Sequence, residues 1–310
     1  MRLSVIVVNW NLKDELAACL DSLRLQTHRE LEVIVVDNGS KDGSAELVRV
    51  SYPECQLLAE TENLGFAEGC NRGIAVASGE WLAMLNNDAV AEPGWAAALV
   101  RAAQNGPERL GMLQSLMLFK QRPETINSTG IEVGPNGGGR DRQDGLPRSA
   151  ALEAQEIFCC SAGAAAYRKT MLEQIKLRNG YFDRTHFMYS EDLDLGWRAR
   201  LAAWTASYVP DSVVYHRWHG SSERHGKSWL RAIARTNRIR TLLKNASWSR
   251  VARLSWNMLG AALEVLWHGK ARGPAALYGA ITTGLAARKE VTALLRVERR
   301  SVEARWFLRG

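Results

Sequence analysis

Short apolar runs alternate with helix-like segments along the first hundred residues of the chain. The runs have strand length, and the segments between them place apolar residues three or four positions apart, as on one face of a helix. Buried parallel strands are apolar throughout and are joined by helices, so the pattern predicts an α/β fold with right-handed crossovers and a sheet covered on both faces. The expected strands are residues 3–8, 31–36, 55–59 and 80–85, and the expected helices begin near residues 11, 45, 67 and 95.

The alternation becomes less regular after a further strand near residues 112–118. Residues 127–147 are rich in Gly, Asn and Arg, which predicts a mobile loop. Ser190 precedes several acidic residues, a pattern that is typical of a helix N-terminus capped by serine. The remaining expectations are one strand at residues 156–167 and a strand pair at residues 206–209 and 212–216, which would close the domain.

The tail from Trp229 differs from the rest of the chain in its charge. It carries 16 Lys and Arg against 4 Asp and Glu, whereas residues 1–228 carry 24 against 29. The net charge of +7 over 310 residues therefore comes from the tail. We expect two regions, an α/β domain at residues 1–225 and basic amphipathic helices at residues 226–310.

Two apolar stretches of the tail, residues 256–267 and 274–287, are shorter than the ~18 residues that span a bilayer. Tryptophan and basic residues lie among and beside them, as in helices that rest in the headgroup layer of an anionic membrane. The alternative is that these helices pack on the α/β domain, or join two copies into an oligomer. Nucleic-acid binding is not expected, because no recognition motif accompanies the basic residues.

The cysteine content and the N-terminus indicate a cytoplasmic protein. Five cysteines form an odd set without the spacing of a disulfide framework or of a zinc site. The apolar N-terminal run stops at Asn9, which is too short for the core of a signal peptide.

Polar residues end several of the expected strands. Asn86, Asn87 and Asp88 follow the fourth strand, and Asp37 follows the second. In open α/β sheets ligands bind beyond the carboxyl ends of the strands, and a carboxylate there can hold Mg²⁺ or Mn²⁺ together with substrate phosphates. The alternative is an ordinary turn, because Asn and Asp are good turn formers.

Two further polar features each have an ordinary structural interpretation. Asp192 and Asp194 lie in the first turn of the expected helix, where acidic residues commonly complement the helix dipole. His216 ends the last expected strand, and a single histidine there is more commonly hydrogen-bonded than metal-bound. Neither feature identifies a site by itself.

Six short motifs follow one another along the chain. They are Val7-Val8-Asn9-Trp10-Asn11, Val35-Val36-Asp37-Asn38-Gly39-Ser40, Asn63-Leu64-Gly65-Phe66 with Asn71-Arg72-Gly73, Leu85-Asn86-Asn87-Asp88, Phe187-Met188-Tyr189 with Glu191-Asp192-Leu193-Asp194-Leu195, and Val214-Tyr215-His216. In this order they resemble the motifs of family 2 glycosyltransferases of the GT-A fold, most closely the bacterial rhamnosyltransferase-like branch. The resemblance covers about residues 3–222 and implies that fold, a Rossmann-like mixed and mostly parallel sheet followed here by a C-terminal helical region.

The resemblance implies a role for each of the polar motif residues. Asp192 would be the catalytic base with Glu191 beside it, and Asp88 and His216 would hold Mn²⁺ or Mg²⁺. The chain departs from the family at Asn86, where the Asp-x-Asp pattern has its first carboxylate, and Asn86 would then hold the ribose or a metal-bound water. The nucleotide-binding residues would be Asn9, Trp10, Asp37, Asn63, Asn71, Asn86 and Asn87.

The implied reaction is metal-dependent, inverting transfer of a sugar such as rhamnose from a UDP- or dTDP-sugar. The acceptor would be a hydroxyl of a glycan or of a lipid-linked intermediate in cell-surface polysaccharide synthesis, at the inner face of the cytoplasmic membrane. One alternative is a sugar-nucleotide pyrophosphorylase, but residues 9–13 are not the Gly-rich phosphate-binding run that it would carry. The other is a non-catalytic module that binds nucleotide sugars or docks at membranes.

Overall fold

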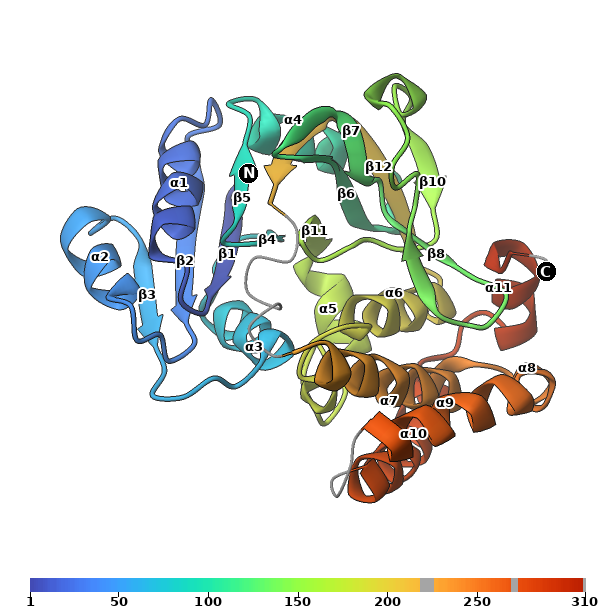
Figure 1. Ribbon diagram of the computed structural model, residues 1–310. Coiled ribbons are helices and arrows are strands. Elements are labelled where there is room, and N and C mark those ends of the chain that lie inside the picture. Colours follow the sequence, from blue (N-terminus) through green and yellow to red (C-terminus); the bar gives the residue numbers. More distant parts are fainter. Residues whose placement is uncertain (218–225, 269–272, 309–310) are drawn as a thin grey trace.

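The computed structural model describes residues 1–217, 226–268 and 273–308 (Figure 1). Its strands are β1 (Leu3–Asn9), β2 (Leu31–Asp37), β3 (Gln56–Ala59), β4 (Trp81–Leu85), β5 (Ala89–Ala91), β6 (Leu110–Phe119), β7 (Arg122–Ser128), β8 (Ile131–Val133), β9 (Gly139–Asp141), β10 (Gln155–Ile157), β11 (Ala164–Arg168) and β12 (Thr205–His216). Its α-helices are α1 (Lys13–Arg24), α2 (Ser44–Ser51), α3 (Phe66–Val76), α4 (Trp95–Asn105), α5 (Lys169–Ile175), α6 (Glu191–Leu201), α7 (Lys227–Asn245), α8 (Trp248–Arg253), α9 (Ser255–His268), α10 (Gly273–Leu294) and α11 (Arg299–Trp306).

Most of the strands form one mixed sheet in the order β10-β12-β6-β11-β4-β1-β2-β3, with β5 beside β12 and β7 beside β6. The strands β4, β1, β2 and β3 are parallel neighbours, as the alternation of strands and helices predicts. β11 is antiparallel to both of its neighbours, β4 and β6. The carboxyl ends of β1, β2 and β4 therefore meet at one edge of the sheet.

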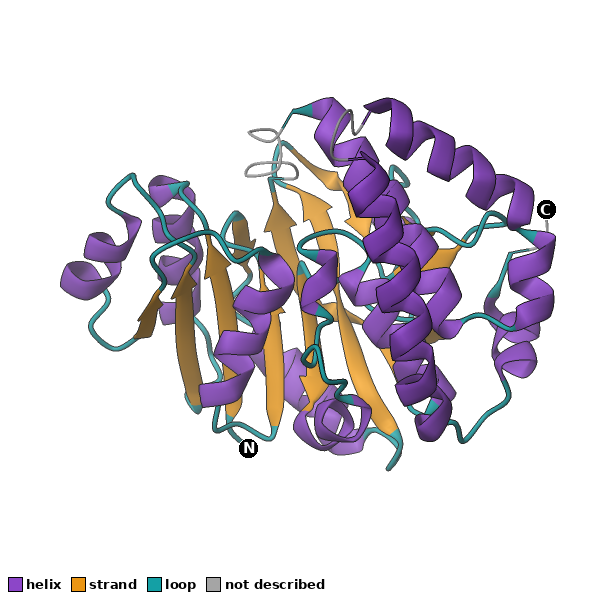
Figure 2. Cartoon of the chain, turned by 90° about the horizontal axis from the view of Figure 1, so that it is seen from below, coloured by secondary structure: helices purple, strands orange, loops and turns teal. Residues whose placement is uncertain are grey.

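Two hydrophobic cores cover the two faces of this sheet (Figure 2). Successive side chains of a strand point to opposite faces, so Val5 and Val7 of β1 pack with α1, α2 and α4, whereas Ile6 packs in the larger core with α3, α5 and α6. The expectation of a sheet covered by helices on both faces is confirmed.

Three segments differ from the sequence-based expectations. Residues 127–147 are not a structureless loop, because they contain the end of β7 and the antiparallel pair β8 and β9. Residues 156–167 form parts of two strands, β10 and β11, rather than one. The expected strand pair after residue 205 is the single strand β12, in which a register shift between Val209 and Val213 interrupts the pairing with β6. Local composition cannot distinguish a turn from such a bulge, because both take a few polar residues and a proline.

The C-terminal helices pack beside α6 (Figure 1) and share the larger core. Leu242 of α7, Val291 of α10 and Val302 of α11 are buried there, and the ring of Phe307 contacts Trp197 of α6 with centroids 4.9 Å apart. None of the helices within the described residues is long and apolar enough to cross a bilayer.

Candidate active site

A pocket of about 600 Å³ opens where the strand ends of the sheet meet the first turn of α6. Eight of the predicted site residues line it, namely Trp10, Asn63, Asn86, Asn87, Asp88, Glu191, Asp192 and His216. The strand-end residues and the helix N-terminus, which are far apart in sequence, thus face one cavity. Their chemical roles stay predictions.

Strand pairing brings His216 beside Asp88. In the antiparallel pair of β5 and β12, His216 lies opposite Ala89, the residue after Asp88. His216 Nε2 lies 3.1 Å from Asp88 Oδ1 and 3.1 Å from the side-chain nitrogen of Asn86. His216 Nδ1 donates to Asn127 Oδ1 at 2.8 Å, because an amide oxygen can only accept. With Nδ1 bonded to Asn127, Nε2 is the ring nitrogen that faces Asn86 and Asp88.

Asn9 and Asp37 are buried and do not line the pocket. The Asn87 side chain donates to Asn9 Oδ1 at 2.7 Å, and Asn9 donates to Asp37 Oδ1 at 2.9 Å. The other Asp37 oxygen accepts from the backbone N–H of Ser40 at 3.1 Å. This chain of hydrogen bonds ties together the carboxyl ends of β1 and β2 and the loop that follows β4.

A second amide pair lies on the α3 side of the pocket. Asn38 donates to Asn63 Oδ1 at 3.1 Å, and both residues line the pocket. Asn71 is buried behind this wall, where its side chain exchanges two hydrogen bonds with the backbone of Phe182, at 2.8 and 3.0 Å. Asn71 therefore anchors the chain leading to α6 rather than facing the cavity.

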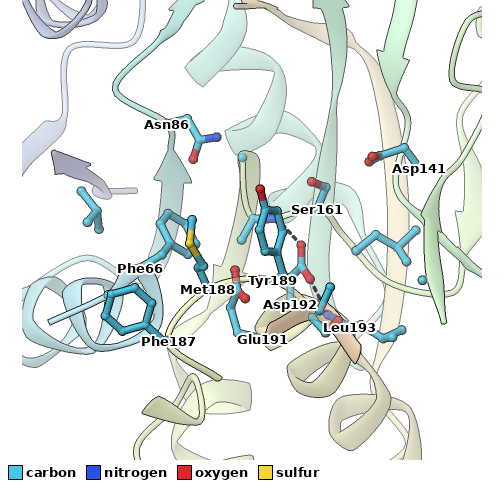
Figure 3. Close-up of a pocket in the computed structure, with 18 of the residues that line it drawn as sticks. Phe66, Asn86, Asp141, Ser161, Phe187, Met188, Tyr189, Glu191, Asp192 and Leu193 are labelled. Atoms are coloured by element: carbon cyan, nitrogen blue, oxygen red, sulfur yellow. Dashed lines mark hydrogen bonds between the residues drawn. The ribbon is translucent and has the colours of Figure 1, made fainter. Parts of the chain in front are cut away.

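The two adjacent carboxyl groups at the start of α6 face the pocket from different electrostatic environments (Figure 3). Burial raises the pKa of Glu191 well above its usual range, the charge of Asp192 adds to this effect, and the Glu191 Oε2 atom has no hydrogen-bond partner among the described residues. Burial also raises the pKa of Asp192, but only to about 6, because backbone N–H groups stabilise its ionised form. These donors are Leu193 at 2.7 Å and Ala162 at 3.3 Å. With a pKa of about 6 Asp192 is mostly ionised at pH 7, whereas the raised pKa of Glu191 favours its protonated form.

The segment that precedes these carboxyls has an unusual backbone. Phe187, Tyr189 and Ser190 have φ values of 62°, 68° and 66°, in the left-handed region that non-glycine residues rarely adopt. Each such residue costs about 1–3 kcal/mol and persists only where its surroundings enforce it. The expected serine cap is wrong, because Ser190 makes no capping hydrogen bond in this conformation.

Several pocket residues were missed by the sequence analysis. Asp141 of β9 lines the pocket, and Figure 3 shows its side chain on the wall formed by that strand. Its negative charge contributes to the raised pKa of Asp192. Leu230, Arg231 and Ala234 of α7 also line the pocket, so the tail helices contribute to the cavity. The sequences of the Gly-rich segment and of the basic tail contain no local pattern that indicates which of their residues line a pocket.

Residues 4–176 match the family model described as glycosyl transferase family 2. The chain is 31% identical over 281 residues to N-acetylglucosaminyl-diphospho-decaprenol L-rhamnosyltransferase of Mycobacterium tuberculosis, which covers 84% of this chain and 90% of that protein. The chain belongs to glycosyl transferase family 2. This membership favours glycosyl transfer over the pyrophosphorylase and the non-catalytic module.

Solved structures show that this glycosyltransferase has the GT-A fold. The mannosyltransferase PcManGT from Pyrobaculum calidifontis, in complex with GDP-Man and Mn²⁺, matches 94% of this chain and 85% of its own, with a TM-score of 0.55 and 19% identity. S. aureus TarS in complex with UDP-GlcNAc matches 95% of this chain and 84% of its own, with a TM-score of 0.56 and 20% identity. At these identities the likeness concerns the fold alone.

Proposed function

We propose that this glycosyltransferase transfers a sugar, with rhamnose as the first candidate, from a nucleoside-diphosphate sugar to a hydroxyl of a lipid-linked or glycan acceptor. The observation that carries the proposal is the carboxyl group of Asp192 in the same pocket as the Asp88–His216 pair. Rhamnose and the lipid-linked acceptor are suggested by the name of the mycobacterial relative, whose sequence aligns with most of this chain.

In the proposed reaction Asp192 takes the proton from the acceptor hydroxyl as the oxygen attacks the sugar. A general base must be ionised at the working pH, and the pKa of about 6 favours Asp192 over Glu191, whose pKa is raised well above its usual range by burial. A double displacement would require a second ionised carboxylate as the nucleophile, and burial disfavours the ionised form of the neighbouring Glu191. These properties support a single displacement with inversion at the anomeric carbon.

The Asp88–His216 pair suits a divalent cation that also binds the donor diphosphate. The 3.1 Å between Asp88 Oδ1 and His216 Nε2 agrees with the ~3 Å expected between two adjacent ligands of an octahedral ion. His216 Nδ1 donates to the Asn127 oxygen, as the second ring nitrogen of a metal-ligating histidine commonly does. Nε2 is then the nitrogen that would bind the cation. Among the described residues no group of three His, Cys, Asp or Glu could hold a metal, so the diphosphate would supply further ligands. A cation bound there would neutralise charge on the departing diphosphate.

We expect donor binding and transfer to require Mn²⁺ or Mg²⁺. With Mn²⁺ present, a panel of nucleotide sugars should include one that stabilises the protein by about 2.7 kcal/mol at 100 times its dissociation constant. EDTA should remove this stabilisation and abolish transfer, and Asp88→Ala should do the same because it removes the anionic ligand. Thermal unfolding and a transfer assay measure both effects. Full activity in EDTA would exclude the metal from the proposal.

The α9–α10 surface provides a candidate contact with the membrane that holds a lipid-linked acceptor. Trp256 and Trp267 on α9 and Tyr278 on α10 are 80%, 82% and 72% exposed. The other exposed apolar residues of these two helices are Leu259, Leu263, Leu266, Ile281 and Leu285. Their spacing of three or four positions places the members of each helix on one side of it, and interfacial helices commonly carry tryptophan there. We propose that this face rests in the headgroup layer of an anionic membrane.

Full-length protein should sediment with anionic liposomes, more strongly at low salt because screening weakens attraction to the headgroups. Replacing both exposed tryptophans, Trp256→Ser with Trp267→Ser, should remove most of this binding. Leu25→Ser is a matched control, because Leu25 is 68% exposed but lies at the end of α1. A double variant that binds liposomes like the wild type, or that instead loses a dimer in sedimentation velocity, would contradict the membrane contact.

A further inference from the structure

Asn237 of α7 makes an unusual set of contacts with the backbone beside the catalytic carboxyls. Its side-chain nitrogen lies 2.8 Å from the carbonyl oxygen of His186, 2.8 Å from that of Met188 and 2.9 Å from that of Tyr189. Asn237 is 1% exposed, so these contacts do not compete with water. The two N–H groups of one amide are thus shared among three carbonyls of residues 186–190, the segment that contains the left-handed residues.

The surroundings of Asn237 fix which way its amide points. Arg240 donates a hydrogen bond to Asn237 Oδ1, and the Arg240 Nε atom donates to Thr283 of α10 at 3.0 Å. A guanidinium can only donate, so it selects the amide oxygen and turns the nitrogen toward the carbonyls. The tail helices α7 and α10 thereby support the segment through a single side chain.

Other contacts hold the start of this segment. The Phe187 carbonyl accepts from the backbone N–H of Ala67 at 3.2 Å, and the His186 ring contacts Thr241 of α7 at 3.0 Å. Gly65 allows the close approach on the α3 side, because a Cβ there would lie 2.6 Å from the Phe187 oxygen. Of the side chains described, Asn237 bonds to the carbonyls of both Met188 and Tyr189, which line the pocket and lead directly into α6.

We propose that Asn237 is a positioning residue of the active site, whose amide holds residues 186–190 in the left-handed conformation that sets Asp192 against the acceptor. Asn237 touches backbone and not substrate, so it acts through the segment. This role rests on the proposed function of Asp192 as the base. A displacement of about 1 Å at a reacting group can reduce the rate by roughly 10²-fold, which gives the segment a large influence on kcat.

Asn237→Ala removes the donor, and Asn237→Asp keeps the size and the Arg240 contact but replaces the N–H groups by an oxygen that the carbonyls repel. Both variants should reduce kcat by at least ~10-fold while the donor dissociation constant in Mn²⁺ stays within about twofold. Hydrogen exchange of the backbone amides at residues 187–193 should become faster, with β1 and β4 unchanged. Ser247→Ala is the control for simple loss of stability, because Ser247 is buried and bonds to Glu303, away from this segment.

Hydrogen exchange tests the positioning role of Asn237 separately from the proposed function, because it is measured without any substrate. Unchanged exchange at residues 187–193 in both variants, or kcat within twofold of the wild type, would overturn the positioning role. An equal loss of kcat in Ser247→Ala at the same loss of melting temperature would overturn it as well. A wild-type protein that transfers no sugar from any donor of the panel would overturn the proposed function instead.

Discussion

Asp192→Asn should reduce kcat by at least ~10²-fold, the usual effect of losing a general base. The amide has nearly the size of the carboxyl, and its oxygen can still accept the shorter hydrogen bond, from the N–H of Leu193, so the start of α6 should keep its structure. The amide NH2 replaces the oxygen that accepts the longer bond from Ala162. The donor contacts lie at the strand ends across the pocket, and donor affinity should therefore change little. Steady-state kinetics and calorimetric titration of the nucleotide sugar measure the two quantities.

The pH profile offers an independent check of the same assignment. Because the base acts in its ionised form and its pKa is raised to about 6, kcat/KM should fall about tenfold per pH unit below pH 6. Glu191→Gln is the matched control, because it keeps the size of the side chain and burial already disfavours the charged form of Glu191. If Glu191→Gln loses activity while Asp192→Asn retains it, the base is the neighbour.

The sequence predicted the half of the site that is built on parallel strands. Asn86, Asn87 and Asp88 follow β4, and the polar ends of β1 and β2 reach the same edge because parallel strands share a direction. Hydrophobic pattern and chain direction suffice for that inference. The hydrophobic pattern did not reveal that Asn9 and Asp37 are buried beside the pocket and do not line it. Whether a strand-end side chain faces the cavity depends on its contacts with neighbouring loops, which local sequence does not show.

The other half of the site depends on long-range packing that local pattern does not encode. Asp141 reaches the pocket only because β9 pairs with β8, within a Gly-rich segment that resembles a loop. Arg231 and Asn237 belong to α7. The position of α7 beside α6 depends on buried contacts between residues that lie about fifty positions apart in the sequence. The left-handed residues before α6 have no sequence signature, because Phe187 and Tyr189 are residue types that seldom adopt this conformation.

The charged residues that join α7 to α6 form a buried network. The Lys244 ammonium pairs with Asp183 and lies 3.0 Å from Asp194 Oδ1, and all three side chains are fully buried. Asp194 also accepts from Arg198 at 3.0 Å. Burial alone would raise the pKa of Asp183, but Lys244 and His186 outweigh it and hold the pKa well below its usual range. Each carboxylate therefore depends on a cation from a neighbouring element.

Lys244→Met should destabilise the protein by about 3–5 kcal/mol, the usual cost of removing one partner of a buried ion pair. The methionine fills a similar volume, so most of the loss comes from the uncompensated charge of Asp183. The loss should be largest at neutral pH. It should shrink as the pH falls below 3.8, the ordinary pKa of an aspartate. Below that pH Asp183 becomes protonated in the unfolded state, so the wild type progressively loses the stability that the ion pair provides.

Chemical denaturation of the full chain at pH 7 and near pH 3 measures this change. Lys120→Met is the control, because Lys120 forms an exposed pair with Glu15 at 2.7 Å, and such pairs contribute only about 0–1 kcal/mol. A free energy of unfolding for Lys244→Met within 1 kcal/mol of the wild type at pH 7 would show that the pair does not stabilise the fold. The expected loss would instead show that α7 stabilises the domain that carries Asp192, so that the C-terminal helices cannot be removed without weakening that domain.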